Sequence, residues 1–486
     1  MLLDFLIGLY VFAALFLAIY ASSQLFLLLV YIRHRRDSLP VPAVAVWPLV
    51  VIQLPLFNER HVVGRLLDSV AALDYPSDRL TVQVLDDSTD ETAAIVAEKV
   101  ASLQKAGLQV QHVRRPQRTG YKAGALAYGL AHTTAELVVV LDADFVPSPD
   151  FLRRTVPYLV ANPKLGMVQT RWGHLNPFNS LLTLGQTLAL DSHFVIEQTA
   201  RSRGGWLMTF NGSGGIWRAQ CIREAGGWRD LTLTEDLDLS YRAQLAGWEF
   251  LYLPDVVVPG ELPPQIAAYK QQQARWAKGT TQTLGHTLRP LWHSRFSFSQ
   301  RFMATLHLCQ YMPHPLMITL LILTPPLLQS KSLQHLPLGV LGGVGLGTPL
   351  IYVISQRAIY ADWPRRLLAF PVLMALGTGI AWSNTRAVID GIIGRNTEFR
   401  RTPKFAHEWH ESGYALRRDP ATWIELLLAA YSLWGMYLAL RLNPALAPYL
   451  GIYGFAFGLV ACWGFYDRWK MYRAAALVHV IPGSRD

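Results

Sequence analysis

The chain has 486 residues, of which 51% are hydrophobic, and its mean hydropathy of +0.21 exceeds that of an ordinary soluble protein. These values exclude a single soluble domain and indicate that part of the chain lies in a membrane. The formal net charge of +10 does not indicate nucleic acid, because basic residues beside apolar spans are typical of membrane proteins. We therefore expect contacts with membrane lipids and none with nucleic acid.

The first segment, residues 2–31, is almost uninterruptedly apolar and is followed by the basic residues Arg33, Arg35 and Arg36. It is too long for the core of a signal peptide and lacks a basic stretch before it, so it predicts an uncleaved transmembrane helix. By the positive-inside rule, the chain after Arg33 begins in the cytoplasm. We expect residues 1–36 to be an anchor, 37–285 a cytoplasmic domain and 286–486 a second membrane region.

Between Leu49 and Gln282, short apolar runs alternate with amphipathic stretches, which is typical of βα units and a mostly parallel sheet. Polar residues follow three of the predicted strands, and the carboxyl ends of parallel strands meet at one edge of a sheet, where nucleotides bind. The predicted strands are 49–54 (before a turn at 55–58), 81–85, 109–113 and 138–145, with a helix at 91–106. The polar residues are Asn58, Glu59, Asp86, Asp87, Asp142 and Asp144.

The apolar strand at residues 138–145 runs into Asp142 and Asp144. Residues two apart on a strand point to the same side, so these carboxylates can share one Mg²⁺ or Mn²⁺. Lys122, in the sequence YKAGAL, can reach a phosphate as a point charge. The ordinary alternatives are two solvated loop acids and a solvated lysine. Because these residues occur among several acidic strand ends, we favour a diphosphate site.

A glycine-rich turn and an acidic helix start come next. In FNGSGG, the backbone around Asn211, Gly212 and Ser213 can approach a ligand closely. In TEDLD, Thr234 is a candidate helix cap. Acids in a first helical turn ordinarily only complement the helix dipole, so the residues alone do not assign them a role.

The last motif of this region, YKQQQARW, contains Gln272, Arg275 and Trp276. Their i, i+3, i+4 spacing places them on one face of a helix. An aromatic platform beside hydrogen-bond donors suits a sugar, so this face is a candidate floor for an acceptor.

In this order, LDDSTD, YKAGAL, DAD, TED and QQARW resemble the family 2 inverting glycosyltransferases of the cellulose synthase-like kind. The resemblance is closest to the group A and C enzymes, which build mannan, glucomannan or glucan, and it runs from Gln53 to Trp276. It implies a GT-A type nucleotide-diphospho-sugar transferase domain with a mixed, mostly parallel sheet, inserted between transmembrane α-helices. The protein would be integral to the plasma or inner membrane.

The resemblance also implies residue roles. Nucleotide binding would involve Asn58, Glu59, Asp86, Asp87, Lys122, Asp142 and Arg275, with Asp86 and Asp87 at the base and ribose. Asp142 and Asp144 would position Mg²⁺ or Mn²⁺, and Asp236, the final acid of TED, would be the general base. Acceptor-binding residues would be Asn211, Gly212, Ser213, Glu235, Gln272 and Trp276.

The expected activity is processive transfer of glucose or mannose, from UDP-glucose or GDP-mannose, to the non-reducing end of a β-linked glycan that is exported. We expect the linkage to be β-1,4. One metal and one base imply a single in-line displacement, which inverts the anomeric centre. The first alternative is a lipid glycosyltransferase that adds a single hexose to diacylglycerol or ceramide. The second is a catalytically inactive binding or scaffold module.

The C-terminal region has an amphipathic stretch at 295–310 and apolar stretches near 311–328, 337–356, 367–385, 422–440 and 446–466. Residues 391–418 and the C-terminus are both basic and should be cytoplasmic. Five crossings would place the C-terminus outside, so one stretch should not cross. We expect it to be 367–385, which is interrupted by Pro371, Gly377 and Gly379 and which we interpret as interfacial or re-entrant.

A basic loop, FRRTPK at Phe399–Lys404, lies within residues 395–410. Such a loop ordinarily contacts lipid headgroups. It is also similar to the F-x-V-T-x-K gating loop of cellulose synthases, which implies that Phe399, Thr402 and Lys404 cover the bound nucleotide. Arg401 stands where that loop has valine.

Overall fold

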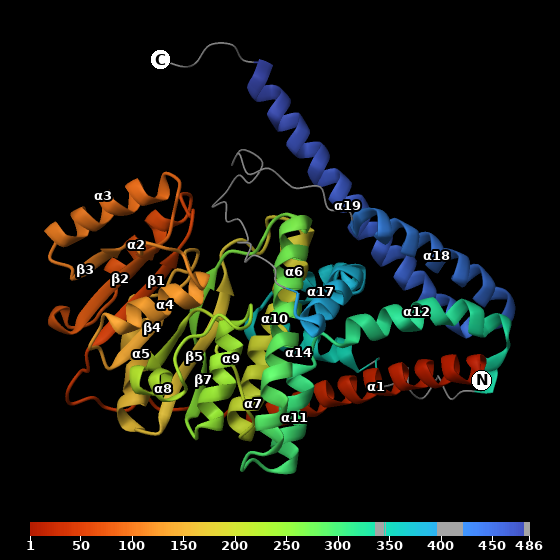
Figure 1. The fold of residues 1–486 in the computed structure, drawn as a ribbon, viewed down its shortest axis with the longest axis horizontal. Coiled ribbons are helices and arrows are strands. Elements are labelled where there is room, and N and C mark those ends of the chain that lie inside the picture. Colours follow the sequence, from red (N-terminus) through yellow and green to blue (C-terminus); the bar gives the residue numbers. More distant parts are fainter. Residues whose placement is uncertain (336–344, 346, 396–420, 481–486) are drawn as a thin grey trace.

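The computed structural model describes residues 1–335, 345, 347–395 and 421–480. An α/β domain lies on one side of the molecule, and long helices extend from it on the other (Figure 1). The strands are β1 (Val50–Leu56), β2 (Leu80–Asp86), β3 (Val110–Val113), β4 (Leu137–Val140), β5 (Leu165–His174), β6 (Gly215–Arg218) and β7 (Glu249–Gly260). The helices of this region are α2 (Val63–Ala71), α3 (Thr92–Lys105), α4 (Tyr121–Ala131), α5 (Phe151–Ala161), α6 (Leu181–Ser192), a π-helix (His193–Gln198), α7 (Thr199–Gly204), α8 (Ala219–Glu224), α9 (Glu235–Leu245) and α10 (Ile266–Trp292).

The strands form one seven-stranded sheet in the order β3-β2-β1-β4-β6-β5-β7. β1 is parallel to both of its neighbours, whereas β6 runs antiparallel to β4 and β5. The sheet is therefore mixed and mostly parallel, as the sequence predicted. The carboxyl ends of β1, β2 and β4 lie at the same edge.

Helices cover both faces of this sheet, because alternate residues of each buried strand point to opposite faces. Leu137 and Val139 belong to the core under α2, α3 and α5, whereas Val138 and Val140 belong to the core under α4, α8 and α9. All four side chains are at most 2% exposed. The continuous apolar run that predicted β4 is thus explained by a strand covered on both sides.

Two predicted strand boundaries were wrong. β1 continues through Pro55, which was expected in a turn, because β1 pairs with β4 only as far as Gln53 and no ladder hydrogen bond is needed from Pro55 on that side. β4 ends at Val140, five residues before the predicted end at residue 145. Beyond it the Asp142 backbone N–H donates to Ser213 Oγ (2.9 Å) and the Phe145 N–H to the Asp142 carbonyl (3.1 Å), which turns the chain out of the sheet.

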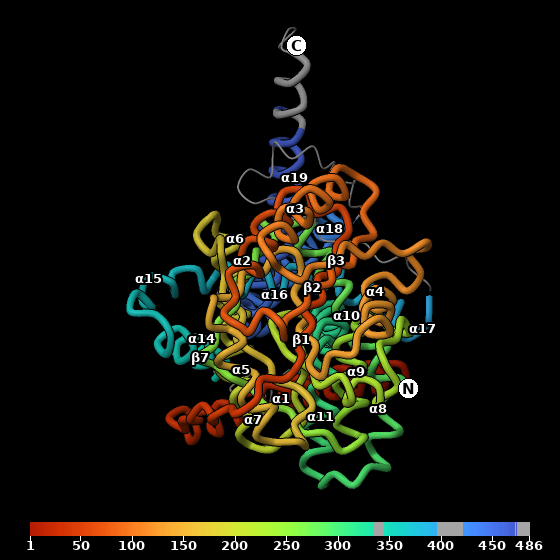
Figure 2. The backbone as a smooth tube through the Cα atoms, turned by 90° about the vertical axis from the view of Figure 1, so that its left-hand side faces the viewer, coloured from red at the N-terminus to blue at the C-terminus, as the bar shows by residue number. Residues whose placement is uncertain are grey.

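The remaining helices are α1 (Leu2–His34), α11 (Phe298–Leu308), α12 (Pro313–Gln329), α14 (Thr348–Ile359), α15 (Trp363–Arg366), α16 (Phe370–Gly379), α17 (Ala381–Ile393), α18 (Ala421–Leu442) and α19 (Ala447–Val480). Among the described residues, four segments are long and apolar enough to cross a membrane: Leu2–His34, Trp363–Ile393, Ala421–Leu442 and Pro444–Met471. α11 and α12 pass the same test together but are bent by 66°. Figure 2 shows α19 extending away from the α/β domain towards the C-terminus.

Several sequence expectations for this region stay predictions. The segment expected to be re-entrant lies within Trp363–Ile393, whose length and composition also suit a crossing. Within the stretch 337–356, residues 337–344 and 346 lie outside the described residues, as does the loop with Phe399, Thr402 and Lys404.

The membrane-side helices hold α10, the helix that carries YKQQQARW. Lys270 Nζ lies 2.6 Å from Glu425 Oε1 of α18, and both side chains are buried. At the start of α10, the Ile266 N–H donates to Asp467 Oδ2 of α19 (2.9 Å). α10 therefore connects the α/β domain to the α18–α19 pair, and it continues to Trp292, beyond the domain boundary expected at residue 285.

Candidate functional site

A cavity of about 180 Å³ lies at the carboxyl edge of the sheet. It is formed by the ends of β1, β2 and β4, the start of α4, the turn before β6, the start of α9 and one face of α10. Most of the residues singled out in the sequence line it: Glu59, Asp87, Lys122, Asp142, Asp144, Asn211, Gly212, Glu235, Asp236, Gln272, Arg275 and Trp276. The topology thus brings residues more than 200 positions apart in the chain into one cavity.

Three predicted site residues instead support its walls. Asn58 receives hydrogen bonds at its side-chain Oδ1 from the Thr89 N–H (2.9 Å) and has a positive φ of 57°, so it joins the loops that follow β1 and β2. Ser213 is fully buried and its Oγ accepts from the Asp142 N–H. Asp86 is 1% exposed. None of the three is among the residues that line the cavity, and their roles in binding stay predictions.

The paired acids after β2 have different environments. Asp86 Oδ2 lies 2.8 Å from His112 Nε2 and Oδ1 accepts from the Ser88 N–H. Although burial opposes its charge, these contacts hold the pKa of Asp86 below its ordinary value. Asp87 lines the cavity and accepts two hydrogen bonds from Arg115, at 2.5 and 3.0 Å. Arg115 also donates to the Tyr121 carbonyl, so Asp87 indirectly fixes the start of α4.

Lys122 is placed by that helix start between several carboxylates. Its Nζ lies 2.6 Å from Asp142 Oδ1, 2.9 Å from the Gly212 carbonyl and 3.8 Å from Glu235 Oε1. Burial opposes its charge, but Asp142 and Glu235 raise the pKa of Lys122 above its ordinary value. It is therefore a protonated cation inside the cavity, available to the phosphate groups of a ligand.

Asp142 and Asp144 present two carboxylates at the turn after β4. Asp144 is 3% exposed and its Oδ2 accepts from the Glu261 N–H (2.9 Å), whereas the side chain of Asp142 is 34% exposed. Mg²⁺ and Mn²⁺ prefer oxygen ligands, and such ions are often held by one or two carboxylates together with water and the phosphates of a ligand. The donor set therefore fits a hard divalent cation that a diphosphate helps to bind.

Asp236 lies at the first turn of α9, against the glycine-rich turn. Gly212 has φ of 84°, and a Cβ there would lie 2.8 Å from Asp236 Oδ2, so only glycine permits this approach. Burial, together with the charge of Glu235, raises the pKa of Asp236 to about 7. The opposing effect of the helix dipole is thus outweighed, and Asp236 is suited to accept a proton near neutral pH.

The predicted capping hydrogen bond at the start of α9 is absent. Thr234 does occupy the position before α9, but its hydroxyl makes no capping hydrogen bond. It lies instead 3.3 Å from Thr283 Oγ1 of α10, and Gly279 of the same helix packs closely against Thr234. The start of α9 is therefore positioned by packing against α10 rather than by a local cap.

Sequence reasoning missed an aromatic and cationic wall of the cavity. The Arg118 guanidinium carbon lies 3.4 Å from the centre of the Phe57 ring and 4.9 Å from that of Tyr121, and all three residues line the cavity. Planar groups of this kind suit stacking on a nucleobase. The basic run RRPQR, which ends two residues before YKAGAL, was the available sign.

Comparisons with known proteins agree with this geometry. Residues 48–279 match the family model described as "Glycosyltransferase like family 2". Glucomannan 4-beta-mannosyltransferase 2 of Arabidopsis thaliana is 46% identical over 237 residues, which are 48% of this chain and 44% of the relative. Glucomannan 4-beta-mannosyltransferase 1 of Oryza sativa subsp. japonica is 45% identical over 258 residues, 51% of this chain and 49% of the relative.

The chain thus spans about half the length of the curated relatives that it matches. Among solved structures, a mannosyltransferase from Pyrobaculum calidifontis, in complex with GDP-Man and Mn2+, superposes with a TM-score of 0.56 at 23% identity. The superposition covers 80% of this chain and 100% of that one. At this level of identity the likeness shows the fold.

Proposed function

We propose that this chain, whose residues 48–279 match the model of glycosyltransferase family 2, is a membrane-bound, processive hexosyltransferase that extends a β-linked glycan with inversion. Its α/β domain has the GT-A type fold, with a mixed, mostly parallel seven-stranded sheet. The observation that carries the proposal is one cavity in which Asp236, with a pKa near 7, lies opposite Lys122 and the Asp142–Asp144 pair. This arrangement suits an attacking hydroxyl and a departing diphosphate.

The side chains that line the cavity suggest the following catalytic and binding roles. Asp236 would accept the proton of the acceptor hydroxyl, while Lys122 and Arg275 would stabilise the negative charge that develops on the departing nucleoside diphosphate. Phe57 and Arg118 would hold the base. A divalent cation held by Asp142 and Asp144 would neutralise part of the diphosphate charge. If Asp236 acts only as a base, the acceptor hydroxyl displaces the diphosphate in a single step, which inverts the anomeric centre.

We further propose that the donor is GDP-mannose and the product a β-1,4-linked mannan or glucomannan. The support is the identity to glucomannan 4-beta-mannosyltransferases and the GDP-Man bound in a protein of similar fold. Base and epimer selection depend on the shape of the cavity, and UDP-glucose remains the competing donor.

A lipid acceptor is disfavoured by a second cavity, of about 310 Å³, that meets the first at Asp236, Gln272 and Trp276. Its lining is polar and aromatic, with Gln273, Gln310 and Tyr311 among its residues. Such a lining suits a carbohydrate chain better than the acyl chains of diacylglycerol or ceramide.

Donor and product can be identified together in membranes that contain the full chain. Membranes would be incubated with radiolabelled GDP-mannose or UDP-glucose and Mn²⁺, then extracted with organic solvent and digested with a β-1,4-mannanase or a cellulase. We expect label from GDP-mannose in insoluble material that only the mannanase releases. Label in the organic phase would instead show a glycolipid product, and an absence of nucleotide binding would show an inactive module.

The proposed export requires a cytoplasmic catalytic domain and a defined topology. We expect a tag after the C-terminus and a tag near residue 400 both to face the cytoplasm, because both regions are basic and residues 367–385 do not cross. Protease protection of each tag in sealed membrane vesicles measures this. Tags found on opposite faces would show that 367–385 is a full crossing.

A further inference from the structure

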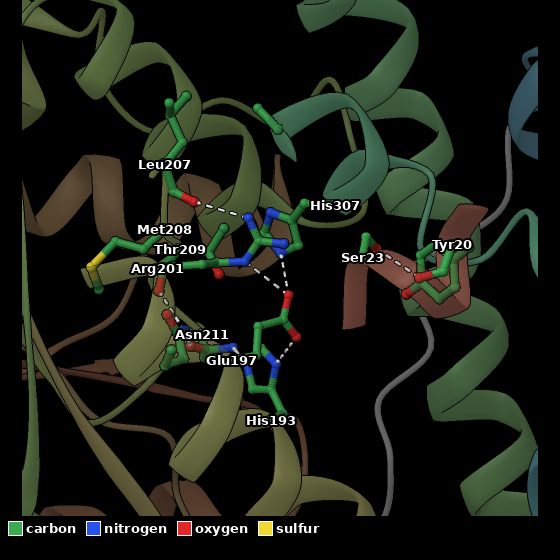
Figure 3. A network of polar contacts seen from close by, with 12 residues as sticks. Tyr20, Ser23, His193, Glu197, Arg201, Leu207, Met208, Thr209, Asn211 and His307 are labelled. Carbon is green, nitrogen blue, oxygen red and sulfur yellow. Dashed lines mark hydrogen bonds and ion pairs between the residues drawn. The ribbon is translucent and has the colours of Figure 1, made fainter. Parts of the chain in front are cut away.

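The second cavity is lined by hydrogen-bonded side chains of which only Asn211 has been given a role above. His193 and Glu197 of the π-helix line this cavity, and Asn211 of the glycine-rich turn lines both cavities. Figure 3 shows His193 between Glu197 and Asn211. Asn211 directly precedes Gly212, the residue that lies against Asp236.

The Asn211 side chain is hydrogen-bonded at both its nitrogen and its oxygen. His193 Nδ1 lies 2.9 Å from Glu197 Oε2, and His193 Nε2 lies 3.0 Å from Asn211 Nδ2. At the other end of the amide, Gln198 Nε2 donates to Asn211 Oδ1 at 2.5 Å and to the Thr209 carbonyl at 3.0 Å. The Asn211 carboxamide is therefore held from two sides.

Each hydrogen bond in this network has only one possible donor, because the Glu197 carboxylate at one end and the Thr209 carbonyl at the other can only accept. Burial opposes the charge of Glu197, but Arg201 and His193 hold the pKa of Glu197 well below its ordinary value, so it is an ionised acceptor. Glu197 thus places the imidazole proton of His193 on Nδ1 and leaves Nε2 to accept from Asn211 Nδ2. From the other end, the Thr209 carbonyl fixes the Gln198 amide as the donor to Asn211 Oδ1.

The π-helix explains why two of its residues reach the same amide. His193 and Gln198 are five positions apart, and in an α-helix with 3.6 residues per turn they would point in different directions. The i→i+5 repeat of the π-helix brings them towards the same side. A π-helical turn, which is often associated with a functional site, is thus needed to clamp Asn211.

We propose that His193 is a positioning residue that, held by Glu197, sets the orientation of the Asn211 carboxamide for the acceptor sugar beside Asp236. An asparagine amide has two N–H donors and two lone pairs on its oxygen. With one of each used by His193 and Gln198, one N–H and one lone pair remain for the hydroxyl groups of a sugar. This inference rests on the proposed function, because it assumes that the acceptor is a carbohydrate.

These hydrogen-bonded side chains belong to a larger buried cluster, and another member of that cluster provides a matched control. Arg201 Nε donates to Glu197 Oε1 (2.9 Å), and Tyr241 Oη lies 2.8 Å from His307 Nδ1. The other ring nitrogen, His307 Nε2, lies 4.0 Å from Glu197 Oε1. Tyr241 is fully buried but lines neither cavity. Tyr241→Phe therefore perturbs the same cluster without touching Asn211.

The test uses the full chain in membranes, with GDP-mannose as donor and β-1,4-linked mannotetraose as acceptor, or UDP-glucose and cellotetraose if those are the active pair. His193→Phe preserves the ring but cannot accept from Asn211. We expect its KM for the tetrasaccharide to rise about tenfold, the effect of one lost hydrogen bond, with the donor KM unchanged. The fraction of donor hydrolysed by water should also rise.

His193→Gln can still accept from Asn211 Nδ2 through its amide oxygen and should restore most of the acceptor affinity. Tyr241→Phe should leave both KM values unchanged. The inference is wrong if His193→Phe has the acceptor KM and the hydrolysis fraction of the wild type. It is also wrong if His193→Phe, like Tyr241→Phe, differs from the wild type only in the amount of folded protein. A wild-type chain that transfers neither sugar would instead overturn the proposed function.

Discussion

Replacing Asp236 by asparagine is expected to lower turnover by at least about 10²–10⁴-fold, the usual contribution of a general base, while nucleotide-diphosphate affinity hardly changes. Asp236 lines both cavities, at the junction of the donor and acceptor regions. The amide has nearly the same size but cannot accept the proton of the acceptor hydroxyl. Initial rates with saturating donor, together with GDP binding measured by calorimetry, separate the two effects.

The pKa of Asp236 adds a pH dependence to this prediction. With Asp236 as the proposed base, transfer would require its ionised carboxylate, and burial with the charge of Glu235 raises the pKa of Asp236 to about 7. Turnover of the wild type should therefore increase as the pH rises through about 7, and should fall about tenfold per pH unit well below it. The residual rate of Asp236→Asn should not show this fall below pH 7.

Asp238→Asn is the matched control on the same helix turn. Asp238 forms an ion pair with Arg242 at 2.7 Å, and it lines neither cavity. Its loss should affect stability more than turnover. If Asp236→Asn kept near-normal turnover, or lost activity only because the donor no longer binds, Glu235 would become the candidate base, since it also lines the donor cavity.

The second large effect is expected from Asp144→Asn, which should reduce transfer by about 10³-fold or more, because a bound cation stabilises charge by several kcal/mol. Asp144 is buried, and its carboxylate accepts from the Glu261 N–H. The amide oxygen of asparagine can keep that hydrogen bond, so the fold should survive while the cation site loses one of its two negative charges.

The measurement is Mn²⁺-dependent binding of GDP alongside the transfer rate, and Asp144→Asn should weaken the first and nearly abolish the second. Asp150→Asn, on an exposed acid before α5, is the control and should change neither. Removal of metal with EDTA should stop the wild-type enzyme and Mn²⁺ should restore it. Undiminished turnover in EDTA would contradict the role of both Asp142 and Asp144.

Local patterns in the sequence were sufficient to predict most of the elements that hold the site. The continuous apolar run of β4 identified a strand covered on both faces, and the i, i+3, i+4 spacing identified the face of α10 that carries Gln272, Arg275 and Trp276. The order of five short motifs was sufficient to indicate the family whose model matches residues 48–279. These features depend on residues that are close in the chain, so their spacing alone reports them.

The tertiary structure alone decided which of these residues line the cavity. Asp86 follows a strand end as Asp142 does, yet His112 on the neighbouring strand, 26 residues away, engages it outside the cavity. The pKa of Asp236 depends on burial between α9 and the turn at Gly212, and the clamp on Asn211 depends on a π-helix that has no sequence period of its own. Such properties arise from contacts between distant segments, and local periodicity contains no information about which distant segments meet.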